Sequence, residues 1–195
     1  MERRAGRRTY TPTPIRQINE RSTSSVTPST ALFAPRANHA RPYASTGIER
    51  AAGFRDRYLE AGIRLPASRI VRSAFDAAGG RLAAERLLRG RVRPMAIFAV
   101  NDFATIGFLG TLRDHGLRPG MDVAVAGFND TPLARELPIP LTTVRSPMHE
   151  MGSLAVELLV RRLDVEQVKS ERLPPELVVR ASTDPTLPSP VILDL

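Results

Sequence analysis

The sequence predicts an α/β fold in which a parallel sheet is flanked by helices. An uninterrupted apolar run at 95–100 has the length and the β-branched content of a strand that is buried on both faces, and 122–128 is expected to form a second buried strand. Segments with apolar residues at helical spacing alternate with these runs, and the connections between them are short. Such alternation is typical of a parallel sheet, because a helix has to carry the chain back before the next strand begins.

The first expected elements follow from apolar spacing and from residues that start or stop helices. Apolar residues recur at helical spacing over 48–59, and Gly62 is placed to end that helix. A short apolar piece at 69–71 follows. Asp76 can then cap a second helix, which Gly90 closes.

The second half continues the pattern. Asn101 and Asp102 open a helix over 103–115, in which Asp102 is expected to serve as a cap, while Asp130 is expected to form a turn. His115 is expected to interact with the carbonyl end of that helix. The remaining expected elements are an extended segment at 141–144, a helix at 148–163 and a last strand at 173–179.

Charge divides the chain unevenly. The net charge is +8, but residues 1–50 hold nine Arg and three acidic residues and so account for +6 of it. Residues 1–45 are Arg-rich and of low complexity, which predicts a disordered or non-homologous leader; 46–184 form the expected domain and 185–195 a proline-rich tail. A basic arm that grips nucleic acid is the alternative for the leader. Without an export signal or a membrane span, a cytoplasmic location is expected.

Polar residues follow the two best strands, and few other residues offer chemistry. Asn101-Asp102 and Asn129-Asp130 are expected at one rim of the sheet, where parallel α/β folds bind ligands. The chain has no Cys, three isolated His and no nucleophile elbow or phosphate loop, so we expect no enzyme, no metal site and no cofactor. A small α/β hydrolase or nucleotide enzyme that uses Asp102 or Asp130 as its acid-base group is the enzyme alternative.

Four motifs in order resemble one known family. They are PMAIFAVNDFATIG at 94–107, GLRPGMDVAVAGFNDTP at 116–132, PLTTVRSP at 140–147 and LPPELVVRAST at 173–183, with RAAGF at 50–54 upstream. Together they resemble the effector-binding domain of LacI/GalR transcriptional regulators. The resemblance implies a periplasmic-binding-protein-like fold of type I, mainly its second lobe. It also implies a small-molecule effector, such as a sugar or a nucleoside.

The resemblance also implies effector-binding residues, carried over position by position. Arg50 matches the family's effector-binding arginine, and Asn129 stands where many members have an aspartate, which puts a borrowed sugar assignment in doubt. Phe75 matches a ring that packs on the ligand, although a core position suits it equally well. The full set of candidates is Thr46, Arg50, Phe75, Asn101 and Asn129.

The chain departs from the family at its beginning. No helix-turn-helix is legible in 1–45, and the strand expected before the Arg50 helix is represented only by the weak run ALFA at 31–34. We therefore expect a truncated sensing domain of a LacI-type regulator, in which the helix at 148–163 lacks its usual partners. DNA binding is expected only in full-length relatives, and Ile106 could contribute to a homodimer. The alternatives are a solute-binding protein of the same fold and a non-functional repressor remnant.

Overall fold

The structure, a computed structural model, describes residues 30–35, 44–90, 93–164 and 167–188, with side chains from residue 47 onward. Its centre is a six-stranded sheet in the order β2-β1-β3-β4-β5-β6. The first five strands run parallel, and β6 pairs antiparallel with β5. The strands are β1 (Thr30–Pro35), β2 (Ile70–Ser73), β3 (Ala96–Ala99), β4 (Ala124–Asn129), β5 (Thr142–Arg145) and β6 (Glu176–Val178).

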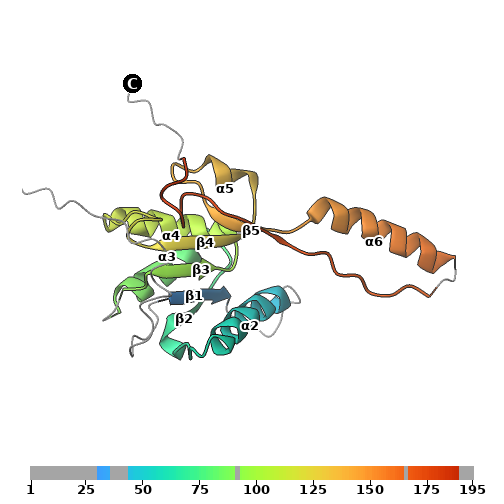
Figure 1. The fold of residues 1–195 in the computed structure, drawn as a ribbon, viewed down its shortest axis with the longest axis horizontal. Coiled ribbons are helices and arrows are strands. Elements are labelled where there is room, and N and C mark those ends of the chain that lie inside the picture. Colours follow the sequence, from blue (N-terminus) through green and yellow to red (C-terminus); the bar gives the residue numbers. More distant parts are fainter. Residues whose placement is uncertain (1–29, 36–43, 91–92, 165–166, 189–195) are drawn as a thin grey trace, which may run out of the picture.

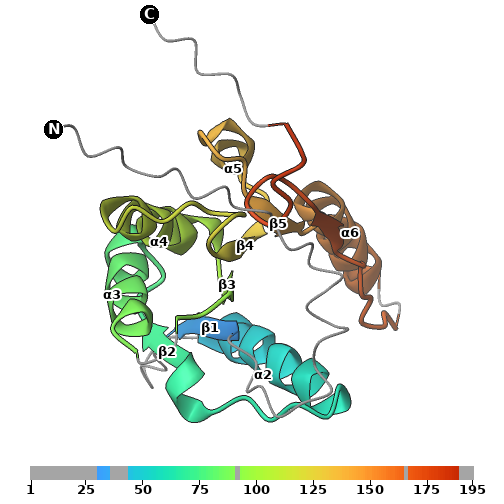
Figure 2. The ribbon, with the colours of Figure 1, turned by 60° about the vertical axis from the view of Figure 1, so that its left-hand side comes forward.

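Helices lie on both faces of this sheet, which confirms the predicted fold class. Two of them, α3 and α4, pack against each other on one face, while α2 lies on the other face (Figures 1 and 2). The longest helices coincide with the segments that helical spacing predicted. The helices are α2 (Ala44–Glu60), α3 (Ala77–Leu88), α4 (Asp102–Asp114), α5 (Pro132–Glu136) and α6 (Met148–Leu163), with a 3-10 turn at Ala67–Arg69.

The two central helices begin at side-chain caps. Asp76 caps α3 as predicted, because its carboxylate accepts a hydrogen bond of 2.7 Å from the Gly79 N–H. The cap of α4 is Asn101, whose Oδ1 accepts from the Ala104 N–H at 2.7 Å. The prediction that Asp102 caps this helix was wrong. Asp102 is the first helical residue, and its buried carboxylate is engaged elsewhere.

Glycine allows α3 and α4 to approach until their backbones touch. A Cβ on Gly80 would overlap with the Ala104 carbonyl, and one on Gly107 would overlap with the Ala77 carbonyl. This close packing seals the main core, in which Phe108 and Leu112 are fully buried against the sheet. The start of α4, which supports the candidate site, is therefore held firmly in place.

β1 lies inside the stretch for which the sequence predicted a leader. The run ALFA, expected only as a weak strand, pairs with β2 on one side and with β3 on the other. A short apolar segment becomes a central strand when other strands pair with both of its edges. The local sequence does not predict this pairing, because the partner strands lie far away in the chain. The rest of the predicted leader, 1–29 and 36–43, lies outside the described residues, as do 189–195 of the predicted tail.

α6 stands apart from the sheet at the end of two arms (Figure 1). The first arm is 142–147, which includes β5 and leads into α6; the second is 167–180, which includes β6 and follows it. None of its residues is buried, although its apolar side chains recur at helical spacing as predicted. Exposed large side chains on this helix are Met148, Met151, Val156, Leu159, Val160 and Leu163. The expectation of a helix without its usual packing partners agrees with this exposure in the described part of the chain.

The α3–α4 contact predicts the effect of adding one methyl group. Gly80→Ala should destabilise the protein by about 1–3 kcal/mol, because the new Cβ collides with rigid backbone. Urea unfolding monitored by circular dichroism measures the change. The matched control is Gly53→Ala in α2, where no atom lies within 4 Å of the added Cβ. That control should be neutral or stabilise by up to about 1 kcal/mol; equal losses in both variants would contradict the packing argument.

Candidate functional site

The candidate site lies at the rim where β3 and β4 end. Because the strands are parallel, their carboxyl ends meet at one edge of the sheet, and polar residues follow each of them. Asn101 comes two residues after β3, and Asn129 is the last residue of β4. The predicted meeting of these two polar turns at one rim is what the sheet register produces.

Arg50 reaches this rim from α2. Its Nη1 donates a hydrogen bond of 2.7 Å to the Val100 carbonyl, and its guanidinium lies 3.7 Å from the centre of the Phe128 ring. Burial lowers the pKa of Arg50 from its usual value, and the nearby charge of Asp102 partly offsets this. The guanidinium is thus a partly desolvated cation stacked on an aromatic face.

Asn101 connects the rim to the loop after β2. Besides capping α4, it donates through Nδ2 a 2.9 Å hydrogen bond to the Phe75 carbonyl. These two hydrogen bonds engage both ends of its amide in holding the fold, and the residue is only 8% exposed. Phe75 itself packs, partly buried, against the core.

Asp102 is the buried centre of the polar network. It is 1% exposed, and its Oδ2 accepts from the Thr131 N–H at 2.8 Å and from the Thr131 hydroxyl at 3.1 Å. Its Oδ1 accepts from the Thr143 hydroxyl at 2.7 Å. One carboxylate therefore joins the start of α4 to the turn after β4 and to β5. Gly127 makes room for it, because a Cβ there would collide with Oδ1.

The turn after β4 has an unusual backbone and a strong ion cluster. Asn129 and Asp130 have φ values of 113° and 53°, in the left-handed region that favours glycine but tolerates Asn and Asp. Asp130 accepts from Arg145 Nε at 2.7 Å, and its other oxygen lies 2.7 Å from Arg180 Nη2. Asp130 thus forms the predicted turn, and its carboxylate also pairs with two arginine side chains.

The pKa of Asp130 reflects a competition between burial and the two nearby arginines. Burial alone would raise it, but the hydrogen bonds and charges of Arg145 and Arg180 outweigh burial and leave the pKa below its ordinary value. The carboxylate is therefore ionised over a wider pH range than an exposed aspartate.

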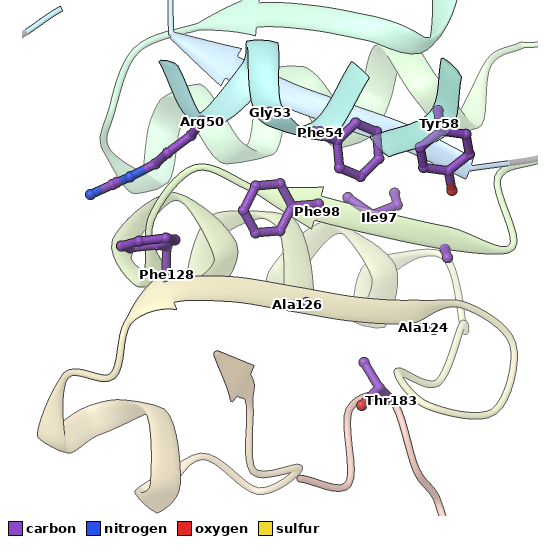
Figure 3. Close-up of a pocket in the computed structure, with 11 residues that line it drawn as sticks. Arg50, Gly53, Phe54, Tyr58, Ile97, Phe98, Ala124, Ala126, Phe128 and Thr183 are labelled. Atoms are coloured by element: carbon purple, nitrogen blue, oxygen red, sulfur yellow. The ribbon is translucent and has the colours of Figure 1, made fainter. Parts of the chain in front are cut away.

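An apolar groove of about 480 Å³ extends from Arg50 along the face of the sheet beneath α2 (Figure 3). Phe54 on α2 and Phe98 on β3 stack there at 5.7 Å with nearly parallel rings. Tyr58 adjoins Phe54 at 4.9 Å. The groove has Arg50 and Phe128 at one end, so it opens at the rim that the strand ends form.

The structure brings four of the five predicted site residues to one place. Arg50 contacts the residues directly before Asn101 and directly before Asn129, namely Val100 and Phe128. Phe75 joins the same cluster through its carbonyl. Thr46 lies in α2, but its side chain is outside the described residues. The assignment of these residues to effector binding stays a prediction.

Sequence reasoning missed several residues that shape the site. Phe128, Arg145 and Arg180 were not considered as candidates, although Phe128 directly precedes Asn129. Their partners lie 15 to 78 positions away, so no local spacing could have revealed the contacts. Ile106 is half-buried in α4, and its part in a homodimer stays a prediction. The prediction that His115 interacts with the carbonyl end of α4 is confirmed, because its Nδ1 lies 3.0 Å from the Thr111 carbonyl.

Two kinds of feature are lacking in the described part of the chain. It contains no group of three or more metal-ligating acidic or histidine side chains. It also contains no helix long and apolar enough to cross a membrane.

The comparison with known families decides what this arrangement belongs to. The family described as "Periplasmic binding protein-like domain" matches residues 28–183, which include β1 and the whole rim. The chain belongs to this family, in the form of the LacI-type effector-binding domain. The resemblance inferred from the four motifs is thereby confirmed.

Individual relatives support the same assignment. The ribose operon repressor of Haemophilus influenzae is 36% identical over 140 residues, which are 71% of this chain and 42% of that protein. The HTH-type transcriptional repressor PurR of Photobacterium profundum is 34% identical over 142 residues, again 71% and 42%. The chain therefore spans about two fifths of these curated relatives. Their names are those of transcriptional repressors and not of enzymes, as the sequence predicted.

A solved structure shows the same fold. A sugar-binding transcriptional regulator of the LacI family from Escherichia coli, complexed with phosphate, superimposes with a TM-score of 0.72 at 27% identity. The match covers 80% of this chain and 55% of that one.

The network around Asp102 predicts a large effect of removing one charge. Asp102→Asn should cost about 2–4 kcal/mol of unfolding free energy, because an amide nitrogen would face a donor in the buried network. Denaturant titration measures the change. Asp122→Asn is the matched control, since Asp122 accepts from the exposed Arg118 N–H and should lose under about 1 kcal/mol. Equal costs would show that Asp102 has no special structural role.

The pKa of Asp130 predicts how stability depends on pH. Since the folded-state pKa lies below the unfolded value of about 3.9, ionised Asp130 stabilises the fold above that pH and loses its contribution as pH falls through the folded pKa. Asp130→Asn should therefore be less stable than the parent at pH 7, and the difference should shrink below about pH 4. Asp56→Asn, at an exposed position of α2, is the control and should change the unfolding free energy at pH 7 by under about 0.5 kcal/mol.

Proposed function

We propose that this chain is the small-molecule-sensing domain of a LacI-type transcriptional regulator and that a sugar or nucleoside binds at the rim beside Arg50. The observation that carries the proposal is the guanidinium of Arg50, held half-buried on the Phe128 ring between the ends of β3 and β4. A cation kept in this state is stabilised by a ligand that offers it oxygen acceptors.

The hydrogen-bonding capacity of the rim fits such a ligand. A guanidinium has five N–H donors, and among the described residues that of Arg50 makes one hydrogen bond, to Val100. Asn129 follows Phe128 directly, and its side chain makes no hydrogen bond to a described residue. Its amide both donates and accepts, which suits hydroxyl groups or the edge of a purine. Polyhydroxylated rings and nucleosides present such paired groups.

The relatives suggest the first compounds to test. Two of them are named ribose operon repressor and PurR, and the matched structure is that of a protein described as a sugar-binding regulator. We therefore choose ribose, hexoses, purine bases and nucleosides as probes. A solute-binding protein of the same fold would bind the same compounds, so binding tests the site itself and not the regulatory role of the whole protein.

The test is a ligand screen with variants of two arginines on the same helix. A compound that binds should raise the melting temperature, and titration calorimetry then gives its Kd. Arg50→Met should weaken binding by about tenfold or more, since a charge-assisted hydrogen bond contributes about 1.5–3 kcal/mol. Arg55→Met is the matched control, because Arg55 is exposed on α2; it should bind like the parent.

Two outcomes would contradict the proposal. One is that none of the probes changes the melting temperature of a chain that circular dichroism shows to be folded. The other is that Arg50→Met and Arg55→Met bind with the same Kd, which would place the ligand away from the rim.

A further inference from the structure

Asp130 is the shared partner of two arginines that belong to two different arms. Arg145 is the last residue of β5, and Arg180 follows β6 by two residues. Each arginine pairs with a different oxygen of Asp130, and both distances are 2.7 Å. The carboxylate is 9% exposed and Arg180 is 15% exposed, so this half of the cluster is well shielded from water.

These two arms carry α6. The chain leaves the sheet after Arg145, forms α6 and returns through β6 to Arg180 (Figure 1). Because no residue of α6 is buried, packing against the described part of the chain does not fix where the helix lies. Its placement depends on the arms, which pair with each other along β5 and β6 and meet β4 at its end.

Hydrogen bonds on the buried side of the turn orient Asp130 towards the arms. Its N–H donates to the Thr143 hydroxyl at 3.3 Å, and the same hydroxyl donates to Asp102. The next residue, Thr131, is also held by Asp102. The left-handed backbone at Asp130 is thus fixed from the buried side, and its carboxylate points to both arginines.

Each arginine has a second contact, which shows what Asp130 adds. Arg145 Nη1 pairs with Glu176 at 3.0 Å, which links one arm to the other. Arg180 Nη1 donates to the Leu141 carbonyl at 2.8 Å. Asp130 joins this pair of arms to the end of β4. Without it, two cations would stand close together, one of them shielded from water and without its counter-charge.

We infer that Asp130 is a positioning residue that clamps both arms to the rim and thereby sets where α6 lies relative to the sheet. The inference goes beyond the proposed ligand site, since it concerns the free chain and needs no ligand. Asp130 directly follows Asn129, so the clamp starts one residue from the candidate binding residue.

The test measures the position of α6 directly. The chain has no cysteine, so spin labels can be attached at Ser153→Cys on α6 and Ala78→Cys on α3, both exposed positions. Double electron–electron resonance gives the distribution of distances between the two labels. For the otherwise unchanged chain we expect one narrow distribution, and Asp130→Ala should cause its loss in favour of a broad one.

Asp114→Ala is a matched control for this experiment. Asp114 also pairs with two arginines, Arg81 at 3.0 Å and Arg113 at 2.8 Å, but it lies at the end of α4 and touches neither arm. It removes the same charge and the same number of ion pairs, so it should keep the narrow distribution. If Asp114→Ala broadens the distribution as much as Asp130→Ala does, or if neither does, the inference is overturned.

Milder variants keep the test decisive if Asp130→Ala fails to fold. Arg145→Met removes one arm's link at a half-exposed position and should broaden the distribution in part. Asp130→Glu retains the charge and should keep the distribution narrower than Arg145→Met does. Where Asp130→Ala folds, adding Arg145→Met should broaden the distribution by less than Arg145→Met does alone, because the Asp130–Arg145 pair is already lost and only the Arg145–Glu176 pair is removed in addition. Additive broadening would contradict a shared clamp.

A ligand that binds at the rim is not needed for any of these results. Failure of the ligand screen with a narrow distance distribution would therefore contradict only the proposed function. A broad distribution in the unchanged chain would contradict only the clamp.

Discussion

The buried carboxylate of Asp102 is the interaction on which the rim depends. Three donors from two later segments converge on it, and it lies at the first turn of α4. Removing a charged group from water is costly unless its hydrogen-bonding capacity is satisfied, so the fold has to place Thr131 and Thr143 where they do this. The turn after β4 and the strand β5 supply these donors, so one carboxylate joins three segments of the rim.

The sequence located most of the elements, but it did not locate β1 as a central strand, the short helix α5 or the polar contacts between elements. Apolar spacing located α3, α4 and α6, and short apolar runs located β3 and β4, because burial imposes a period on the residues themselves. Two adjacent polar residues at the start of α4 were harder to distinguish. Both Asn101 and Asp102 can cap a helix, and the choice depended on the hydroxyls of Thr131 and Thr143, which are 29 and 41 positions from Asp102.

The candidate site shows the same division. Arg50 and Asn129 were found through the family resemblance, whereas the ring beneath Arg50 and the cations around Asp130 appear only when the strands are side by side. Asn101, a candidate binding residue, has a clear structural role. It caps a helix and holds the Phe75 carbonyl, and these structural contacts position the loop that the family resemblance assigned to ligand binding.

Three consecutive residues connect the parts of this molecule. Phe128 carries the Arg50 guanidinium, Asn129 ends β4 at the rim, and Asp130 holds the two arms of α6. Asn129 and Asp130 both have positive φ values, and hydrogen bonds from Asp130 to Thr143 and from Thr131 to Asp102 hold this turn in place. A ligand bound at Arg50 and Asn129, as proposed, would therefore contact the residue that directly precedes Asp130. If both proposals hold, ligand binding and the position of α6 depend on two adjacent residues of one turn.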